Sequence, residues 1–91
     1  MYALVLTSRF ERRIAKFKRA HPEINKQLAK VLRDLEADPF RGYLRLHPLK
    51  GEMEGLHAVR VTQAYRITLT LKVTEKEIIL LDIGSHDDVY R

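Results

Sequence analysis

Residues 56–83, LHAVRVTQAYRITLTLKVTEKEIILLDI, decide the fold of this chain of 91 residues. Between residues 65 and 73, apolar side chains occupy every second position and polar ones most of the others, which is typical of a strand with one buried face. After the polar turn at residues 74–76, the segment 78–83 is apolar almost without interruption, as in a central strand of a sheet. These two strands predict a β-hairpin at the centre of a sheet.

A strand and a helix are predicted before this hairpin. Residues 2–7 are mostly apolar, which favours a first strand of the same sheet. Ser8 and Glu11 then have the spacing of a capping box, in which two side chains bond free amides at the start of a helix. Between residues 10 and 17 the largest apolar side chains share one face of that helix, and its remaining surface is strongly basic.

A second helix is predicted to follow after a tight break. Pro22 ends the first helix, because the residue before a proline is pushed out of helical geometry, and it also suits the first turn of the next helix. Apolar residues recur at helical spacing from residue 24 to residue 35, and Asp38-Pro39 closes the segment. Consecutive amphipathic helices of this kind form a hairpin whose apolar stripes must be buried.

The remaining turn and strand signals complete the fold class. Residues 40–55 contain three glycines and Pro48, which predicts a loop with one short edge strand at residues 46–49. Residues 56–61 predict a further strand that a bend joins to the central hairpin. We therefore expect a single α+β domain over residues 1–91, with two N-terminal helices in a hairpin packed on a four- to five-stranded, mainly antiparallel sheet.

The net charge of +5 is concentrated in the first half of the chain. Residues 1–45 carry 11 Lys and Arg against 5 Asp and Glu, whereas residues 46–91 carry 6 against 7. A local basic excess favours phosphate backbones or an acidic protein partner, although a basic helix surface also serves solubility alone.

The composition excludes several classes of protein. The sequence has no cysteine for a disulfide or a thiolate nucleophile, and no apolar run near the roughly 20 residues that a membrane span needs. Its first residues lack the basic start of a secretion signal, so a cytoplasmic location without membrane attachment is expected. Phosphate-binding glycine loops, GxSxG elbows and HExxH pairs are also missing.

What remains for chemistry is a scattered set of basic and aromatic residues. They are His47, Lys50, Arg60, Tyr65, Arg66, His86 and Tyr90. Such a set suits cleavage of RNA without a metal: the ribose 2′-hydroxyl is the nucleophile, one side chain takes its proton, cations stabilise the pentavalent phosphate, and an acid protonates the leaving oxygen. We therefore expect neither a metal site nor a cofactor.

These residues, in their order along the whole chain, resemble the RelE/ParE toxin superfamily. The resemblance is carried by Ser8-Arg9-Phe10, His47-Pro48-Leu49-Lys50-Gly51, Val59-Arg60-Val61, Tyr65-Arg66-Ile67 and Gly84-Ser85-His86-Asp87-Asp88-Val89-Tyr90. It implies a toxin of a type II toxin-antitoxin pair, most members being ribosome-dependent endonucleases that cut mRNA. It also implies a cognate antitoxin protein as partner, in a toxin-antitoxin hetero-oligomer, with the ribosome and mRNA as targets.

The last of these motifs, at residues 84–90, is most similar to the histidine-using, YafQ-like branch of the superfamily. The resemblance to that branch implies catalytic roles for His47, His86 and Tyr90. Arg66 matches the strand arginine that contacts the scissile phosphate in the RelE branch, and Arg60 stands where the histidine-using branch has a further histidine. The expected catalytic set is therefore His47, Arg60, Arg66, His86 and Tyr90.

Phosphate contacts are also expected from Lys50 and from the basic face of the first helix. The residues of that face are Arg9, Arg12, Arg13, Lys16 and Arg19. Purely structural roles stay open for two strand residues. Tyr65 is in phase with the apolar positions, which favours a place in the core, and Arg66 could form a salt bridge with Asp82 in place of a phosphate contact.

Two other functions are compatible with the same resemblance. A ParE-like toxin inhibits DNA gyrase without cutting RNA and shares the fold, and an attenuated homologue would act only by binding. His47 and His86 favour the endonuclease, because a toxin that only binds has no need of histidines at these places.

Overall fold

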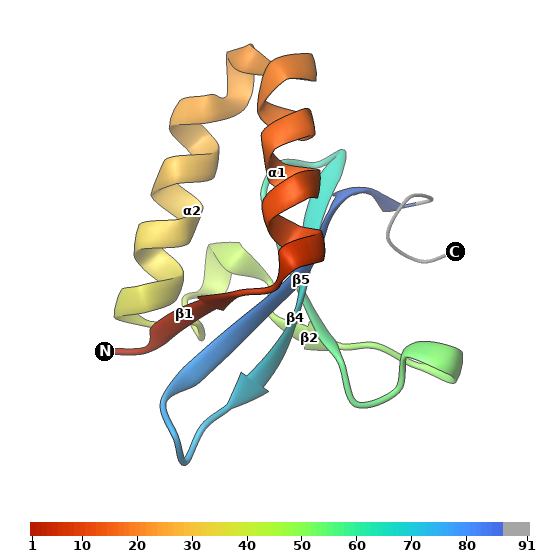
Figure 1. Cartoon of the computed structure of the whole chain (residues 1–91). Coiled ribbons are helices and arrows are strands. Elements are labelled where there is room, and N and C mark those ends of the chain that lie inside the picture. The colour runs from red at the N-terminus through yellow and green to blue at the C-terminus, as the bar shows by residue number, and fades with distance from the viewer. Residues whose placement is uncertain (87–91) are drawn as a thin grey trace.

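The computed structural model describes residues 1–86 and shows a helical hairpin and a five-stranded sheet (Figure 1). The strands are β1 (Ala3–Leu6), β2 (His47–Pro48), β3 (His57–Arg60), β4 (Tyr65–Lys72) and β5 (Glu77–Ser85). The helices are α1 (Ser8–Ala20) and α2 (Asn25–Ala37), and short 3-10 turns form η1 (Pro22–Ile24), η2 (Gly42–Leu44) and η3 (Gly51–Met53). The predicted α+β class is confirmed, and so is the short edge strand, which is β2.

The sheet is mixed, with the order β1-β5-β4-β3-β2. The pairs β5-β4, β4-β3 and β3-β2 are antiparallel, as predicted, but β1 runs parallel to β5. A parallel pair needs a long connection between its strands, and here nearly the whole chain lies between them. The prediction of a mainly antiparallel sheet therefore holds for three of the pairings and fails for β1.

The strands β4 and β5 form the predicted central hairpin. Ile67 lies opposite Ile83, and a bulge follows in the register between Thr68 and Leu69. Ile67 and Leu69 are fully buried, as their alternation predicts. Val73, however, lies beyond β4 and is 53% exposed, because the chain turns after residue 72.

Thr7, rather than Ser8, caps α1. Its hydroxyl oxygen accepts the N–H of Phe10 at 3.1 Å and donates to the carbonyl oxygen of Leu80 at 2.8 Å. Ser8 is already the first residue of the helix, so the predicted capping box of Ser8 and Glu11 is wrong by one position. The cap also fixes the end of β1 to β5.

The break between the two helices is longer than predicted. Pro22 opens the 3-10 turn η1, and α2 begins only at Asn25. The apolar stripe of α2 is nevertheless buried as expected, with Leu28, Val31 and Leu35 fully inaccessible. Neither α1 nor α2, the α-helices described within residues 1–86, is long and apolar enough to cross a membrane.

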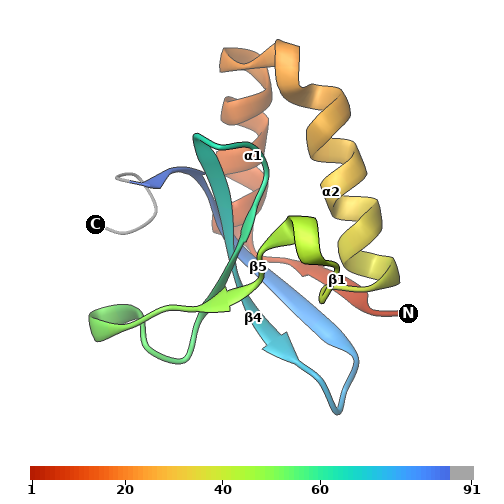
Figure 2. The same ribbon diagram turned by 180° about the vertical axis from the view of Figure 1, so that it is seen from behind.

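Both helices contribute to one hydrophobic core with the sheet. Phe10 and Phe17 of α1 and the buried stripe of α2 join strand residues such as Val59 and Ile67 in a single cluster. Figures 1 and 2 show α1 against β5 and the C-terminal half of α2 beside η2. Arg60 and Arg66 alternate with these core residues, so their side chains point to the other face of the sheet, where they line the site described next.

Candidate functional site

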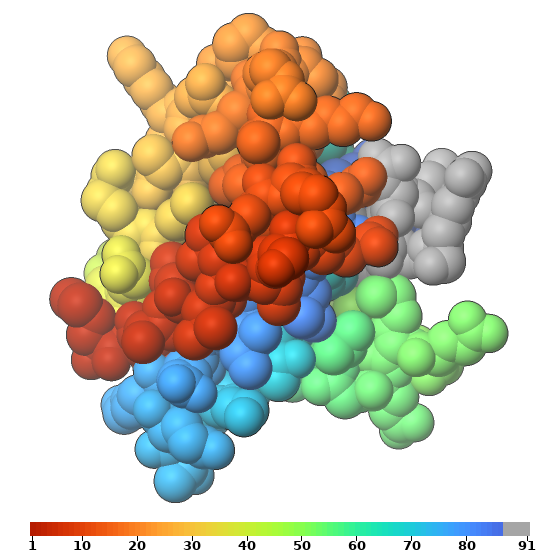
Figure 3. Space-filling model, in the orientation of Figure 1, coloured from red at the N-terminus to blue at the C-terminus, as the bar shows by residue number. Residues whose placement is uncertain are grey.

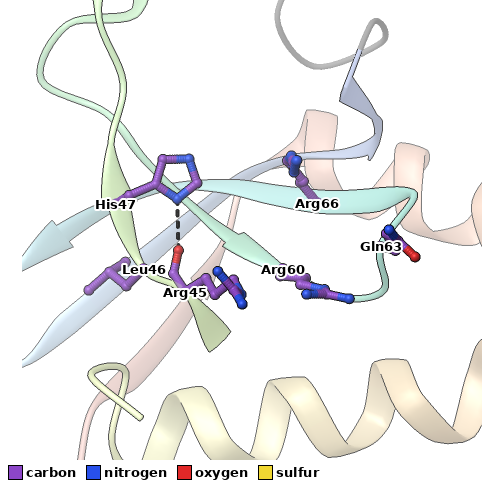
Figure 4. Close-up of a pocket in the computed structure, with 6 residues that line it drawn as sticks. All are labelled: Arg45, Leu46, His47, Arg60, Gln63 and Arg66. Carbon is purple, nitrogen blue, oxygen red and sulfur yellow. Dashed lines mark hydrogen bonds between the residues drawn. The ribbon is translucent and has the colours of Figure 1, made fainter. Parts of the chain in front are cut away.

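Side chains predicted to act on RNA meet in a pocket at the ends of β2, β3 and β4. The pocket has a volume of about 570 Å³ and is lined by Arg45, Leu46, His47, Arg60, Gln63 and Arg66 (Figure 4). The fold thus brings together His47, Arg60 and Arg66, which are distant in the sequence. Because the lining combines arginines and a histidine with no carboxylate, the pocket is suited to an anion.

Two of the arginines lie directly opposite each other across the sheet. Arg60 of β3 is paired in register with Arg66 of β4. Like charges in that position repel each other, and neither guanidinium group has a hydrogen bond or an ion pair with any residue described. Nε of Arg66 is buried without a partner, which is costly for a cation. An anion bound between the two side chains would remove both costs.

His47 is held in one tautomer by the backbone. Its Nδ1 lies 2.7 Å from the carbonyl oxygen of Arg45 (Figure 4). A carbonyl oxygen can only accept a hydrogen bond, so Nδ1 carries the proton and Nε2 of the neutral ring is an acceptor. His47 is exposed, and its Nε2 is therefore available to take a proton from a ligand in the pocket.

Arg45 completes this arrangement, although sequence reasoning missed it. Its backbone has φ 51° and ψ 46°, in the left-handed region that residues other than glycine rarely adopt. This conformation costs about 1 kcal/mol. It follows η2 and brings the Arg45 carbonyl to His47 and the Arg45 side chain to the pocket. Neither Gly nor Asn stands at this position, so the sequence carried no signal for it.

A hydrogen-bonded cluster ties η2, and with it Arg45, to α2. The Tyr43 hydroxyl donates to the carboxylate of Asp34, and Lys30 Nζ lies 3.0 Å from the same carboxylate and 3.2 Å from the hydroxyl. The hydrogen bonds from Tyr43 and then Lys30 lower the pKa of Asp34. Partial burial, followed by the bond to Asp34, raises the pKa of Tyr43, so the phenol is neutral at physiological pH.

A second pocket of about 500 Å³ adjoins the pocket of His47, Arg60 and Arg66, which we call the cationic pocket. The second pocket is lined by Gln27, Tyr43, Arg45, Arg60, Val61, Thr62 and Gln63. Arg45, Arg60 and Gln63 line both, so these three side chains stand between the two hollows. Figure 4 shows that Arg45 comes from the segment before β2, whereas Gln63 comes from the turn between β3 and β4.

The other predicted site residues lie outside the cationic pocket. Lys50 is exposed between β2 and η3 and does not line the pocket. His86 is exposed just after β5, whose last residue, Ser85, pairs with Tyr65 at the start of β4. Tyr90 lies outside the described residues. Its predicted role, and that of His86, stay predictions.

Tyr65 is half-buried and packs against the core, as its place in phase with the apolar strand residues predicted. Its ring packs edge-on against Phe17 with centroids 5.0 Å apart, and against His21 at 4.8 Å. The Tyr65 hydroxyl also lies 3.4 Å from Nδ1 of His21. The histidine at the end of α1 therefore has a structural place between the helix and β4.

Two arginines of the basic helix serve the fold. Arg13 Nε lies 2.7 Å from one oxygen of the buried Asp82 carboxylate, and Arg9 Nη2 lies 3.1 Å from the other. Asp82 therefore pairs with both arginines, and the phosphate contacts expected of Arg9 and Arg13 stay a prediction. The alternative salt bridge between Arg66 and Asp82 is not formed among the ion pairs of residues 1–86.

The rest of the basic helix surface faces solvent. Arg12, Lys16 and Arg19 are exposed and have no ion pair with residues 1–86. In the space-filling view of Figure 3, α1 lies at the centre of the face toward the viewer. These three side chains keep the phosphate-binding role predicted for them as an expectation. Within the same described range, His, Asp and Glu side chains form no group of three that could hold a metal ion.

Solved bacterial toxins have the same fold as this chain. The crystal structure of YafQ from E. coli strain BL21(DE3) matches with a TM-score of 0.82 over 100% of both chains, at 15% sequence identity. A chain of the E. coli DinJ-YafQ complex matches with a TM-score of 0.72 over 100% of both chains, at 16% identity. In sequence, Toxin YoeB of Streptomyces coelicolor is 27% identical over 64 residues, which cover 70% of this chain and 74% of that toxin.

The helical hairpin and the sheet thus form a RelE-like fold. The family described as "Bacterial toxin of type II toxin-antitoxin system, YafQ" matches residues 2–91, and the chain belongs to this family. It is a toxin of a type II toxin-antitoxin system, and the resemblance to the RelE/ParE superfamily is confirmed.

Proposed function

We propose that this toxin cleaves mRNA in the pocket of His47, Arg60 and Arg66, and that the ribosome presents the RNA to it. The observation that carries the proposal is the pair of facing arginines, one of which has a buried nitrogen with no partner. A phosphodiester is the anion that uses both the arginines and the neighbouring histidine base. Membership of the YafQ toxin family supports the same reaction.

The reaction divides among these side chains as follows. Nε2 of His47 takes the proton of the 2′-hydroxyl, and the freed oxygen attacks the adjacent phosphorus. Arg60 and Arg66 neutralise the charge that develops on the pentavalent phosphate. The bond from phosphorus to the 5′-oxygen then breaks as an acid gives that oxygen a proton. The products are a 2′,3′-cyclic phosphate and a 5′-hydroxyl end.

We assign the acid to His86 and a contact with the RNA to Tyr90, as the resemblance implies. The register supports His86, because it follows Ser85, which pairs with the residue before Arg66 in β4. The reaction is proposed to need no divalent ion, since the pocket offers guanidinium and imidazole groups but no carboxylate.

The decisive experiment maps mRNA ends after the purified toxin is incubated with translating ribosomes. His47→Ala and Arg66→Ala are each expected to lower cleavage by about a hundredfold or more. Arg33→Ala, which removes an exposed arginine of α2, is the matched control and should cleave like the wild type. A chelator at a concentration that leaves ribosomes intact should not stop the reaction. Wild-type toxin that arrests growth without producing new mRNA ends would refute the proposal and favour a toxin that acts by binding.

The antitoxin partner is proposed to cover basic and edge surfaces of the toxin. Val5 and Leu6 are 40% and 47% exposed on β1, which is an edge strand of the sheet, and α1 adds Arg12, Lys16 and Arg19. An acidic segment with an apolar stripe, or one that adds a strand to β1, would complement these surfaces. The solved DinJ-YafQ complex shows that a related toxin is found with a partner chain. Co-expression with the adjacent small reading frame should abolish growth arrest and yield a stable complex.

The exposed cations of α1 are proposed to bind ribosomal RNA in the cytoplasm. Binding to phosphates should then weaken as salt is raised. Replacing Arg12, Lys16 and Arg19 by glutamate should weaken ribosome binding with little change in stability, because exposed charges contribute little to folding. Unchanged ribosome affinity would assign this surface to solubility or to the antitoxin.

A further inference from the structure

We propose that the second pocket is a subsite for the nucleotide next to the cleaved phosphate, with the Tyr43 ring as the platform on which its base stacks. The inference rests on the proposed cleavage of RNA. It adds a residue that holds the flanking base and that neither the sequence motifs nor the family resemblance had singled out.

The two pockets are arranged as consecutive nucleotide sites. Arg45 and Arg60 line both, so a phosphate bound at the cationic pocket leaves the adjoining sugar and base beside the second one. The second pocket has about 500 Å³, which is within the size range of small-molecule sites. An RNA strand that enters at His47 can therefore continue past the two arginines toward Tyr43.

Tyr43 is exposed, yet its ring is fixed in place. The residue is 40% exposed, and its hydroxyl bonds the Asp34 carboxylate on α2. Lys30 Nζ lies over one face of the ring, 4.2 Å from its centroid. A base would stack on the other face, and little conformational entropy would be lost because the ring is already held. Stacking on an aromatic side chain is the usual way in which proteins hold an unpaired base.

The polar groups around this ring suit a nucleotide better than a peptide. Gln63 is exposed and has no hydrogen bond with the described residues, so its amide can bond a base edge. Gln27 Nε2 donates to the carbonyl oxygen of Val61 at 3.3 Å, which holds the turn against α2. The arginines could bind a carboxylate as well as a phosphate, but a planar base would in addition stack on the aromatic ring and bond the amide along its edge.

The test measures binding to ribosomes whose mRNA carries a 2′-O-methyl group that blocks cleavage. Each test compares two mRNAs, one with an intact nucleotide next to the blocked phosphate and one with an abasic nucleotide at that place. The comparison is made once for the nucleotide on the 5′ side of the phosphate and once for the nucleotide on the 3′ side. Tyr43→Ala is expected to weaken binding of the intact mRNA about tenfold, the range of one stacked base. Tyr43→Ala should not weaken binding of the mRNA that lacks the stacked base, because the contact is already absent there. Tyr43→Phe, which keeps the ring, should bind within about threefold of the wild type.

Each alternative has its own result. If Tyr43→Ala weakens binding of intact and abasic mRNA equally on both sides, or if Tyr43→Phe is as weak as Tyr43→Ala, the stacking role is refuted. If only antitoxin binding depends on the ring, the pocket is a protein site and the inference is wrong. Arg66→Ala distinguishes failure of the subsite from failure of the proposed function. If Arg66→Ala binds weakly while Tyr43→Ala binds normally, only the subsite is refuted. Failure of the wild type to bind the programmed ribosome overturns the proposed function and the subsite with it.

Discussion

Replacing Arg13 by glutamine is expected to destabilise this toxin, although the residue lies on a helix rich in exposed cations. The Asp82 side chain is only 10% exposed, and Arg13 Nε is its nearest cation at 2.7 Å. Removing one partner of a buried ion pair costs about 3–5 kcal/mol. Here a second cation, Arg9, stays paired and Arg13 is one-third exposed, so we expect roughly half of that, about 2 kcal/mol. In a domain of this size such a loss lowers Tm by about 10 °C.

Urea and thermal unfolding of matched variants measure this effect. Arg12→Gln removes the neighbouring exposed charge and should change the free energy of unfolding by less than about 0.5 kcal/mol. The double variant Arg9→Gln/Arg13→Gln should lose more than the single one, because Asp82 is then buried without a cation. Adding Asp82→Asn to that double variant should restore part of the loss. Equal stability of Arg12→Gln and Arg13→Gln, or no recovery with Asp82→Asn, would refute the reasoning.

Three further changes test the cap, the strained loop and the cluster on α2. Thr7→Ala should lower the free energy of unfolding by about 1–2 kcal/mol, whereas Ser8→Ala should change it by less than about 0.5 kcal/mol; urea unfolding of both variants decides which residue is the cap. Arg45→Gly should keep its stability or gain up to about 1 kcal/mol, because glycine adopts positive φ without strain, while mRNA cleavage falls at least about tenfold. A clear loss of stability in that variant would show that the arginine side chain is structural. The lowered pKa of Asp34 means that its hydrogen bonds contribute stability in full above its unfolded pKa, near about 4, and lose it as pH falls through the lower folded pKa. Thermal unfolding of Asp34→Asn between about pH 5 and about pH 2 should lack this part of the pH dependence.

Local patterns predicted the elements of the fold better than their connections. Alternation in β4 and the apolar run of β5 identified the central hairpin, because burial of one face leaves a period of two in the sequence. The parallel direction of β1 leaves no such trace, since a short apolar strand reads the same in either direction. Thr7 and Ser8 are both good cap residues, and only the point where β1 ends decides between them.

In the site, too, sequence motifs predicted individual residues but not the contacts between segments that are distant in the sequence. The motifs predicted a site with His47, Arg60 and Arg66, and the register of β3 and β4 brings the two arginines together. The structural role of Arg13 was not predicted, because its carboxylate partner lies 69 positions away in the sequence. Arg45 was missed because its place in the pocket depends on a backbone angle, which its residue type does not reveal.

Because β1 pairs with β5, this toxin can complete its fold only after nearly all of its chain has been synthesised. Thr7 bonds Leu80, 73 positions later, and the last strand made is inserted between the first strand and β4. The chain emerges from the ribosome with its N-terminus first, so the earliest strand waits for almost the whole chain before it has a neighbour. Contacts of such long range also form slowly after release. A chain interrupted before residue 77 would carry the arginines of the pocket but lack β5, the strand that pairs with β4 and β1. Incomplete products of translation should therefore be harmless to the cell that makes them.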